Sequence, residues 1–243
     1  MAEVIFVTSA RGGAGATTCA VRLGLALAEK GERTLIIDGD RDYAAGLEIC
    51  GLQGLNVYTL ADAEEGACRI KQAILQHPAS PNLYVLPTLG CKDPLSAERA
   101  AKECSSLFDR ILCDGTARGA CGRAILVSDP YSASLVCAKA KGALIKDSGI
   151  ADTQVVLNKV NGGLVFDGEI LTPQEFASVV RLPLLGIIPE DPYLPLGKAR
   201  TNTRKAFSMT ADTLMGKSKK TYGVIKPYAG LKGAIKRKLR ACL

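Results

Sequence analysis

The feature that most constrains the fold is a repeated alternation of short apolar segments with longer helical stretches. The expected strands are rich in apolar and β-branched residues and lie at Glu3–Thr8, Arg33–Asp38, Asn82–Leu86, Arg110–Cys113, Ala124–Val127, Thr153–Leu157 and Leu184–Ile188. The main expected helices lie at Thr17–Lys30, Arg69–Gln76, Ser96–Ser106, Ser132–Lys146, Pro173–Val180 and Thr203–Met215. Buried strands that alternate with helices predict a doubly wound α/β fold, with a mostly parallel sheet covered on both faces.

The length and composition indicate a single large domain. The chain has 243 residues, of which 47% are hydrophobic and 23% charged, which excludes a disordered protein. We expect the domain to cover residues 1–216, followed by a linker over 217–229 and a terminal helix over 230–243. No apolar run reaches the ~18 residues of a membrane-spanning helix, and the N-terminus has no leader pattern. These features predict a cytoplasmic protein.

The charge is distributed unevenly along the chain. The net charge is +7, but from Lys198 to Leu243 there are thirteen Lys or Arg and one acid, Asp212, a balance of +12. The preceding part has 18 basic and 23 acidic residues, a balance of −5. An acidic body with a basic tail predicts a tail that contacts an anionic surface, and no binding of nucleic acid by the body.

Cysteine and histidine usage excludes several kinds of site. The nine cysteines are scattered without a C-x-x-C pair, which argues against a zinc knuckle or a disulfide framework and favours a reducing compartment. We expect most of them to be small buried side chains. His77 is the only histidine, which argues strongly against histidine metal sites and Ser-His triads.

A glycine-rich loop joins the first expected strand to the first expected helix. Glycines in this position let backbone N–H groups close around a phosphate beside the positive end of a helix dipole. The complete motif, G-x-x-x-x-G-K-[ST], has a lysine where this chain has Ala16. The expected phosphate-binding residues are Gly12, Gly13, Ala14, Gly15, Ala16, Thr17 and Thr18.

The loop resembles that of the MinD/ParA family, which reads K-G-G-x-G-K-[ST]-T. The resemblance implies that Arg11 takes the place of the early lysine, which in the family reaches the partner's phosphate across a nucleotide-bound dimer. Ile37–Asp40 is similar to the family's D-x-D segment, in which the later acid, here Asp40, orients the attacking water. Ile111–Asp114 is similar to the strand that ends in a magnesium-facing acid. The implied magnesium ligands are Thr17, Asp38 and Asp114.

Further segments extend the resemblance over nearly the whole chain. Asn158-Lys159 and Pro183–Asp191 match family segments, which implies that Asn158 and Pro189 lie beside the adenine. Ala61–Leu75 resembles the MinD branch and not ParA. The resemblance therefore implies ATP and magnesium as cofactors, and division regulators similar to MinC and MinE as partners. It also implies a homodimer or a heterodimer with an intact MinD-like paralogue. The implied role is septum placement or a related positioning at the inner membrane face.

Two departures from the family pattern predict a pseudo-ATPase with weakened nucleotide binding. An ammonium about 4 Å from a phosphate oxygen contributes about 4 kcal/mol at an effective dielectric near 20, and Ala16 lacks it. Phosphoryl transfer depends on such charge neutralisation. Second, Gly115–Gly122 leads almost directly into the next strand, so the family's switch helix is abbreviated. Two alternatives stay open: slow hydrolysis rescued by Arg11, Arg118 or Arg123, or a loop that binds nothing.

Residues 230–243 predict a short amphipathic helix. At ~100° per residue the apolar side chains gather on one face and most of the basic ones on the other, which suits the interface of an anionic membrane. The expected membrane-contacting residues include Leu231, Ile235, Lys236, Arg237 and Leu239. Two such tails in a dimer would strengthen attachment by avidity. The alternative is a basic helix that packs on its own domain or on an acidic protein.

A less favoured alternative is an iron–sulfur redox protein. The nitrogenase iron protein shares the fold and holds a [4Fe–4S] cluster between protomers through two cysteines in each subunit. Gly90-Cys91 and Cys121-Gly122 lie in roughly corresponding places in this chain. Because the surrounding segments resemble MinD, we interpret the two cysteines as a coincidence among nine.

Overall fold

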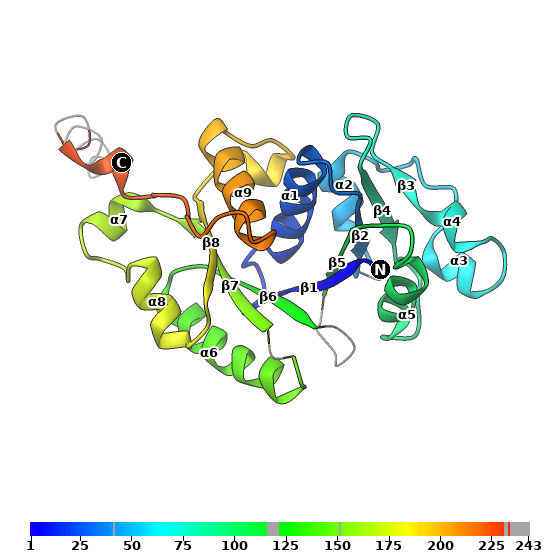
Figure 1. Ribbon diagram of the computed structural model, residues 1–243, viewed down its shortest axis with the longest axis horizontal. Helices are drawn as coiled ribbons and strands as arrows, with labels where there is room; N and C mark the ends of the chain where they lie inside the picture. The colour runs from blue at the N-terminus through cyan, green and yellow to red at the C-terminus, as the bar shows by residue number, and fades with distance from the viewer. Residues whose placement is uncertain (41, 116–121, 151, 231–232, 234–243) are drawn as a thin grey trace.

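The computed structural model describes residues 1–40, 42–115, 122–150, 152–230 and 233. They form one eight-stranded sheet in the order β3-β4-β2-β5-β1-β6-β7-β8 (Figure 1). Its strands are β1 (Glu3–Ser9), β2 (Thr34–Asp38), β3 (Leu75–Gln76), β4 (Leu83–Pro87), β5 (Arg110–Asp114), β6 (Arg123–Ser128), β7 (Asp152–Val160) and β8 (Leu184–Pro189). All neighbouring strands are parallel except β3, which runs antiparallel to β4 at one edge.

Helices cover both faces of the sheet (Figure 1). One face carries α1 (Ala16–Glu29), α2 (Ala45–Cys50) and α9 (Thr201–Leu214). The other carries α3 (Leu60–Glu64), α4 (Ile70–Ala73), α5 (Ser96–Cys104), α6 (Ser132–Asp147) and α8 (Pro173–Val180). The remaining elements are α7 (Gly162–Phe166) and two 3-10 turns, η1 (Leu194–Leu196) and η2 (Lys226–Tyr228). The predicted doubly wound, mostly parallel α/β fold is confirmed.

The sequence dictates these elements through burial and capping. All five residues of β2 are buried, as expected for a central parallel strand covered on both faces. The helix α8 begins where Thr172 and Glu175 form a reciprocal capping box and Pro173 supplies a preset first turn, so its bounds agree with the prediction. At α1, Gly15 adopts a left-handed conformation as the residue before the helix.

One predicted helix is wrong in part. The expected helix at Arg69–Gln76 is only the single turn α4, after which Ile74 is extended and Leu75–Gln76 forms β3. The reason is pairing: Leu75 lies opposite Val85 and Gln76 opposite Tyr84, which adds an antiparallel edge strand to β4. The helices α2, α3 and α7 were not predicted, and each is six residues or shorter.

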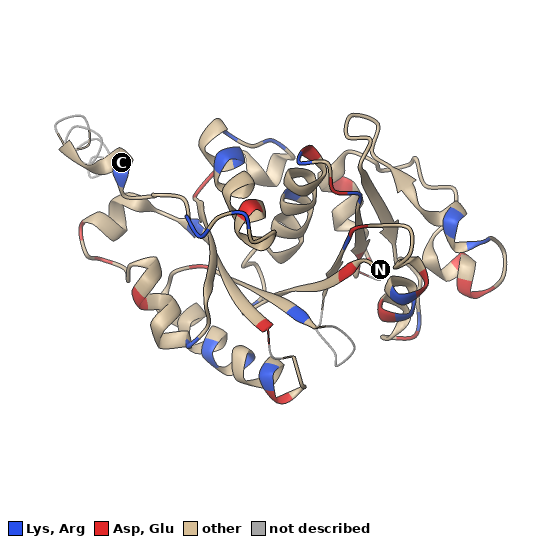
Figure 2. Cartoon of the chain, in the orientation of Figure 1, with Lys and Arg blue, Asp and Glu red and all other residues tan. Residues whose placement is uncertain are grey.

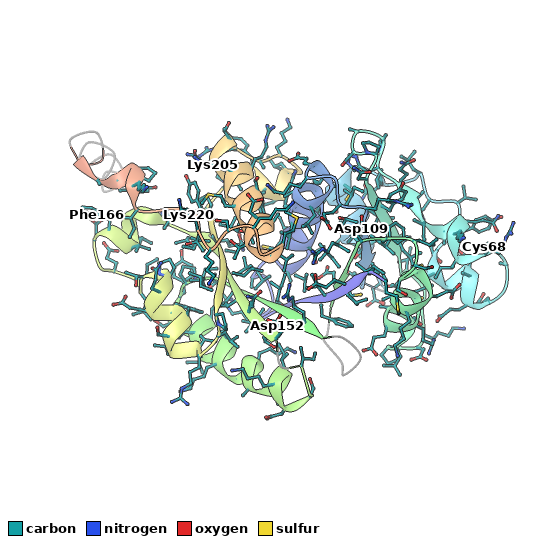
Figure 3. All side chains as sticks on the ribbon, in the orientation of Figure 1. Cys68, Asp109, Asp152, Phe166, Lys205 and Lys220 are labelled. Atoms are coloured by element: carbon teal, nitrogen blue, oxygen red, sulfur yellow. The ribbon has the colours of Figure 1, made fainter. Side chains whose placement is uncertain are left out.

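Charged residues gather at the amino edge of the sheet. Figure 2 shows a basic residue at the start of β6 and an acidic one at the start of β7. Arg123 donates to Asp152 at 2.6 Å and pairs with Glu3 at 2.7 Å, and Arg110 pairs with Glu3 and Glu32. Asp152 and Asp109, labelled in Figure 3, mark this edge. Arg123 therefore lies at the end of the sheet opposite the glycine-rich loop, and the suggestion that it rescues hydrolysis is wrong.

The described cysteines are mainly packing residues. Cys19, Cys50, Cys91, Cys104 and Cys113 are buried, and Cys68 and Cys137 are half-buried, which confirms the expectation for most of them. Cys91 belongs to the apolar cluster beneath α5. Its suggested partner in a cluster site, Cys121, lies outside the described residues, as does Arg118.

The segment that follows α9 lies against the domain. It passes Lys220 (Figure 3), places Tyr222 and Val224 against the apolar core, and forms η2 beside α7. The carbonyl oxygen of Val224 approaches Gly162 so closely that a side chain at position 162 would collide with it. Among the described residues, no helix is long and apolar enough to cross a membrane. The predicted membrane-contacting residues Leu231, Ile235, Lys236, Arg237 and Leu239 lie outside that set.

Candidate nucleotide-binding site

The glycine-rich loop lies between β1 and α1 at the carboxyl edge of the sheet. Gly13 and Gly15 have φ values of 78° and 91°, a left-handed conformation that glycine adopts without steric cost. The loop is anchored where Ala10 N donates to Val127 O at 2.8 Å. Because α1 begins at Ala16, the unpaired N–H groups of its first turn face the loop, which is a favourable place for an anion.

Two consecutive residues of β7 hold this loop from the side. Asn158 Nδ2 donates to Ala14 O at 2.9 Å, and Lys159 Nζ donates to Gly13 O at 2.7 Å. Successive side chains of a strand normally point to opposite faces. Here the register of β7 shifts between Leu157 and Val160, and Lys159 has a φ of 57°, so both side chains reach the loop.

Asn158 fits closely against the loop and keeps one polar atom unused. It is 2% exposed, and a Cβ atom at Gly15 would meet its Nδ2 at 2.5 Å. Its Oδ1 is buried without a hydrogen-bond partner in the part of the chain that the structure describes. A buried acceptor of this kind is costly unless a ligand donates to it. This orphaned oxygen indicates a binding site beside the loop.

Asp38, at the end of β2, is fully buried. Its Oδ2 accepts from Gly46 N at 2.8 Å and from Leu47 N at 3.3 Å, at the start of α2. Its Oδ1 has no partner among residues 1–40, 42–115, 122–150, 152–230 and 233. Burial raises the pKa of this carboxyl to about 6, although the backbone hydrogen bonds oppose the shift.

Asp114, at the end of β5, lies beside Asp38 and the loop. Burial, with the charges of Asp38 and Asp40, raises the pKa of its carboxyl to about 6, although the Thr17 hydroxyl opposes the shift. A side chain at Gly39 would collide with the carbonyl oxygen of Asp114, which shows how closely β2 and β5 approach here. The structure thus brings together the three predicted magnesium ligands.

These oxygens suit a magnesium ion. Magnesium prefers hard oxygen ligands and is usually held by one or two carboxylates together with phosphate oxygens. The unpartnered Oδ1 of Asp38 and the Thr17–Asp114 pair offer that donor set, and Thr17 and Asp114 line a cavity of about 540 Å³ with the loop. Asp40 lines the same cavity, and its Oδ1 accepts from Asp42 N and Tyr43 N at 3.1 and 2.9 Å.

Arg11 is bound within its own chain. Its Nη2 forms an ion pair at 2.8 Å with Asp129, a carboxylate that is 2% exposed, and its Nε donates to Ser134 Oγ at the start of α6. The Arg11 side chain itself is 44% exposed. Arg11 was predicted from the sequence as a site residue, but its two partners were not, because they lie more than a hundred residues further along the chain.

A larger cavity of about 780 Å³ adjoins the loop. It contains both residues expected beside the adenine, Asn158 and Pro189, together with Gly13, Gly15 and Thr18. Its lining also includes residues that were not predicted from the sequence, among them Lys159, Tyr222, Val224 and Tyr228. The last three come from the segment after α9, whose composition resembles a linker and gives no sign of a wall.

Ala16 leaves the loop without its usual cation. It is the first residue of α1, is half-buried and packs against the central apolar cluster.

The site as a whole is that of a P-loop nucleotide-binding protein. This class is defined by a strand–loop–helix cradle with a helix N-terminus, two acidic strand ends and an adjoining cavity. The chain belongs to the CobQ/CobB/MinD/ParA nucleotide-binding family, whose model matches residues 5–203.

Several MinD proteins of this family are similar to the chain. The septum site-determining protein MinD of Thermotoga maritima is 31% identical over 206 residues, which cover 78% of this chain and 76% of that protein. The MinD of the Aquifex aeolicus MinC:MinD complex superimposes with a TM-score of 0.80 at 26% identity, covering 89% and 97% of the two chains. Pyrococcus horikoshii MinD complexed with Mg-ADP gives a TM-score of 0.76 at 28% identity, covering 90% and 100%.

Proposed function

We propose that this protein is a MinD-like regulator of septum placement, or of a related positioning system, that acts as a pseudo-ATPase scaffold. The observation that carries the proposal is the contrast between a preserved cradle and its missing cation. Thr17, Asp38, Asp114 and Asn158 are arranged for a nucleotide with magnesium, while Ala16 supplies no charge. Binding in such a cradle is weakened, and cleavage is impaired more strongly, because negative charge moves between phosphate oxygens in the transition state.

The connection after Asp114 supports the loss of catalysis. The strands β5 and β6 are parallel and lie on either side of β1, and the eight residues Gly115–Gly122 join them. Parallel strands usually need a crossover of about a dozen or more residues, commonly a helix. Residues 116–121 lie outside the described part of the chain, but by length alone eight residues are fewer than a crossover with a helix usually takes. An element of that kind would be needed to respond to the γ-phosphate.

In this proposal the chain's own residues bind and orient a nucleotide. Asn158 and Pro189 hold the base in the 780 Å³ cavity, and the loop N–H groups bind the phosphates. Thr17, Asp38 and Asp114 would hold magnesium, which neutralises phosphate charge when bound. Bound nucleotide would favour a dimer, either of this chain or with an intact paralogue, and partners similar to MinC or MinE would bind that dimer.

The alternative is a slow ATPase that cycles on and off the membrane. Asp40 favours it, because this carboxylate lines the same cavity as Thr17 and Asp114 and is available to orient a water molecule. In either case the protein would be peripheral on the inner face of the membrane, attached by residues 230–243.

Calorimetric titration with Mg-ATP, followed by a phosphate-release assay, separates the two. We expect weak binding, no turnover above background, and about a tenfold or greater gain in affinity in Ala16→Lys, since an ammonium beside phosphate contributes about 4 kcal/mol before desolvation. We also expect Ala16→Lys to remain inactive because the crossover stays short. Turnover by the wild type that disappears in Asp40→Ala would overturn the pseudo-ATPase proposal in favour of the slow ATPase.

A further inference from the structure

We propose that Lys159 replaces part of the missing charge of the loop by neutralising the phosphates of a bound nucleoside diphosphate or triphosphate. This inference rests on the proposed nucleotide binding and adds a residue that the glycine-rich motif does not contain. Lys159 comes from β7, far from the loop in sequence. The hydrogen bond of 2.7 Å from its ammonium to Gly13 O places a cation directly on the loop, which has no lysine at position 16.

The backbone of β7 is distorted where it presents this ammonium. Lys159 is one of two described residues other than glycine with a positive φ, and the register with β8 shifts between Leu157 and Val160. The other, Arg181, ends α8, where a left-handed residue is common. A lysine within a strand has no such reason to adopt this conformation. Backbone strain of this kind persists where the surroundings require it, often at functional sites.

The ammonium has donors left for phosphate oxygens. A lysine ammonium carries three N–H donors, and the contact with Gly13 O uses one of them. Lys159 is exposed and lines the 780 Å³ cavity beside Gly13, Gly15 and Thr18, so a ligand in that cavity can reach it.

The acidic residues nearest to this side of the cavity have other partners. Glu190 accepts from Asn161 Nδ2 at 3.0 Å, and Asp191 accepts from Thr203 Oγ1 at 2.7 Å and from Arg200 N at 2.8 Å. Lys141, on α6, lines the smaller cavity with Thr17 and Asp114, but the structure bonds Lys159 and not Lys141 to the loop. The geometry therefore favours Lys159 as the compensating cation.

The test compares ligands that differ only in phosphate number. Adenosine, AMP, ADP and ATP, with magnesium, compete with a fluorescent ADP analogue for the full-length protein. In Lys159→Met, which keeps the length but not the charge, we expect ADP and ATP to bind roughly ten- to a hundredfold more weakly, with adenosine unchanged. Lys159→Arg should retain most of the affinity. The exposed Lys205→Met on α9 (Figure 3) should change it less than twofold, and Lys141→Met should weaken ADP and ATP binding less than Lys159→Met does.

A second arm tests whether Lys159 and position 16 share one role. If both supply charge to the same phosphates, Lys159→Met should have a much smaller effect in the Ala16→Lys background. An equal loss for adenosine and ATP would instead assign Lys159 to shaping the loop, and a larger loss in Lys141→Met would assign the charge to α6; either result overturns the inference. Absence of nucleotide binding by the wild type would also overturn it, while leaving a nucleotide-independent scaffold intact.

Discussion

At the scale of single residues, the site contains buried carboxylates whose negative charge is not fully balanced by nearby cations among the described residues. Asp38 and Asp114 lie side by side with Asp40 nearby, and no lysine at position 16 offsets them. Such an arrangement stores unfavourable electrostatic free energy that magnesium or a proton can relieve.

The stability of the protein should fall as the pH rises through about 6. An unfolded aspartate has a pKa near 3.9, whereas both folded carboxyls have a pKa of about 6, so between these values the folded state binds more protons. Each carboxyl therefore destabilises the fold by at most about 3 kcal/mol above that window. Urea denaturation at pH 5 and pH 7.5, without magnesium, measures the difference.

The matched variant for this prediction is Asp114→Asn, which keeps an acceptor for Thr17 but does not titrate. It should reduce the difference in unfolding free energy between pH 5 and pH 7.5. Magnesium should stabilise the wild type more at pH 7.5 than at pH 5, because protons compete for the same oxygens. Equal stability of the wild type at both pH values would contradict the raised pKa values.

Replacement of Arg11 should destabilise the fold as well as alter the loop. Arg11→Ala leaves Asp129 buried without its cation, and leaving a buried charged group unpaired costs about 2–3 kcal/mol. Chemical denaturation should show this loss. In Arg11→Ala/Asp129→Asn much of it should return, since the buried charge is gone. If the single variant is as stable as the wild type, the ion pair has no structural role.

At the scale of elements, much of the fold follows from local sequence, while the site depends on contacts between distant segments. The apolar runs predict the seven longer strands, and the capping box at Thr172 sets α8. The prediction fails at Leu75–Gln76, because pairing with β4 decides the conformation of that short segment.

In the candidate site, too, some features follow from local sequence and others depend on contacts between distant segments. The loop and its acidic neighbours are evident from glycines and strand ends. The contacts of Lys159 with Gly13 and of Arg11 with Asp129 are not, because each joins positions more than a hundred residues apart. A left-handed residue within a strand, which brings Lys159 to the loop, has no sequence signal when the residue is a lysine.

The docking of the segment after α9 should depend on Gly162. In Gly162→Ala the new methyl group would collide with Val224 O and crowd Tyr228, so η2 should separate from α7. Trypsin should then cleave at Lys217, Lys219 or Lys220 at least several times faster than in the wild type, because undocked backbone is accessible. The remaining domain should stay intact, which would show that the fold survives. Unchanged cleavage would mean that the segment docks without this close contact.

At the scale of the whole molecule, the positively charged C-terminal part of the chain follows directly after the segment that lines the 780 Å³ cavity. Tyr222, Val224 and Tyr228 wall that cavity, and the predicted membrane helix follows directly at 230–243. Lys217, Lys219, Lys220 and Lys226 add positive charge to the approach. Each basic residue near an anionic surface contributes about 1 kcal/mol, so attachment should depend on charge as well as on the apolar face.

Sedimentation with anionic vesicles tests this arrangement. Deletion of 230–243 should abolish binding, and Ile235→Asp/Leu239→Asp should weaken it strongly while keeping every basic residue, because the apolar face would no longer enter the interface. High salt should weaken wild-type binding, since exposed charges are screened beyond about 3 Å at 1 M ionic strength. Lys205→Gln, which removes a charge from α9, serves as the matched control and should bind normally. If the deletion variant still sediments with the vesicles, the domain and not the tail contacts the membrane. If the wild type binds neutral vesicles as well as anionic ones, the basic residues do not contribute to attachment.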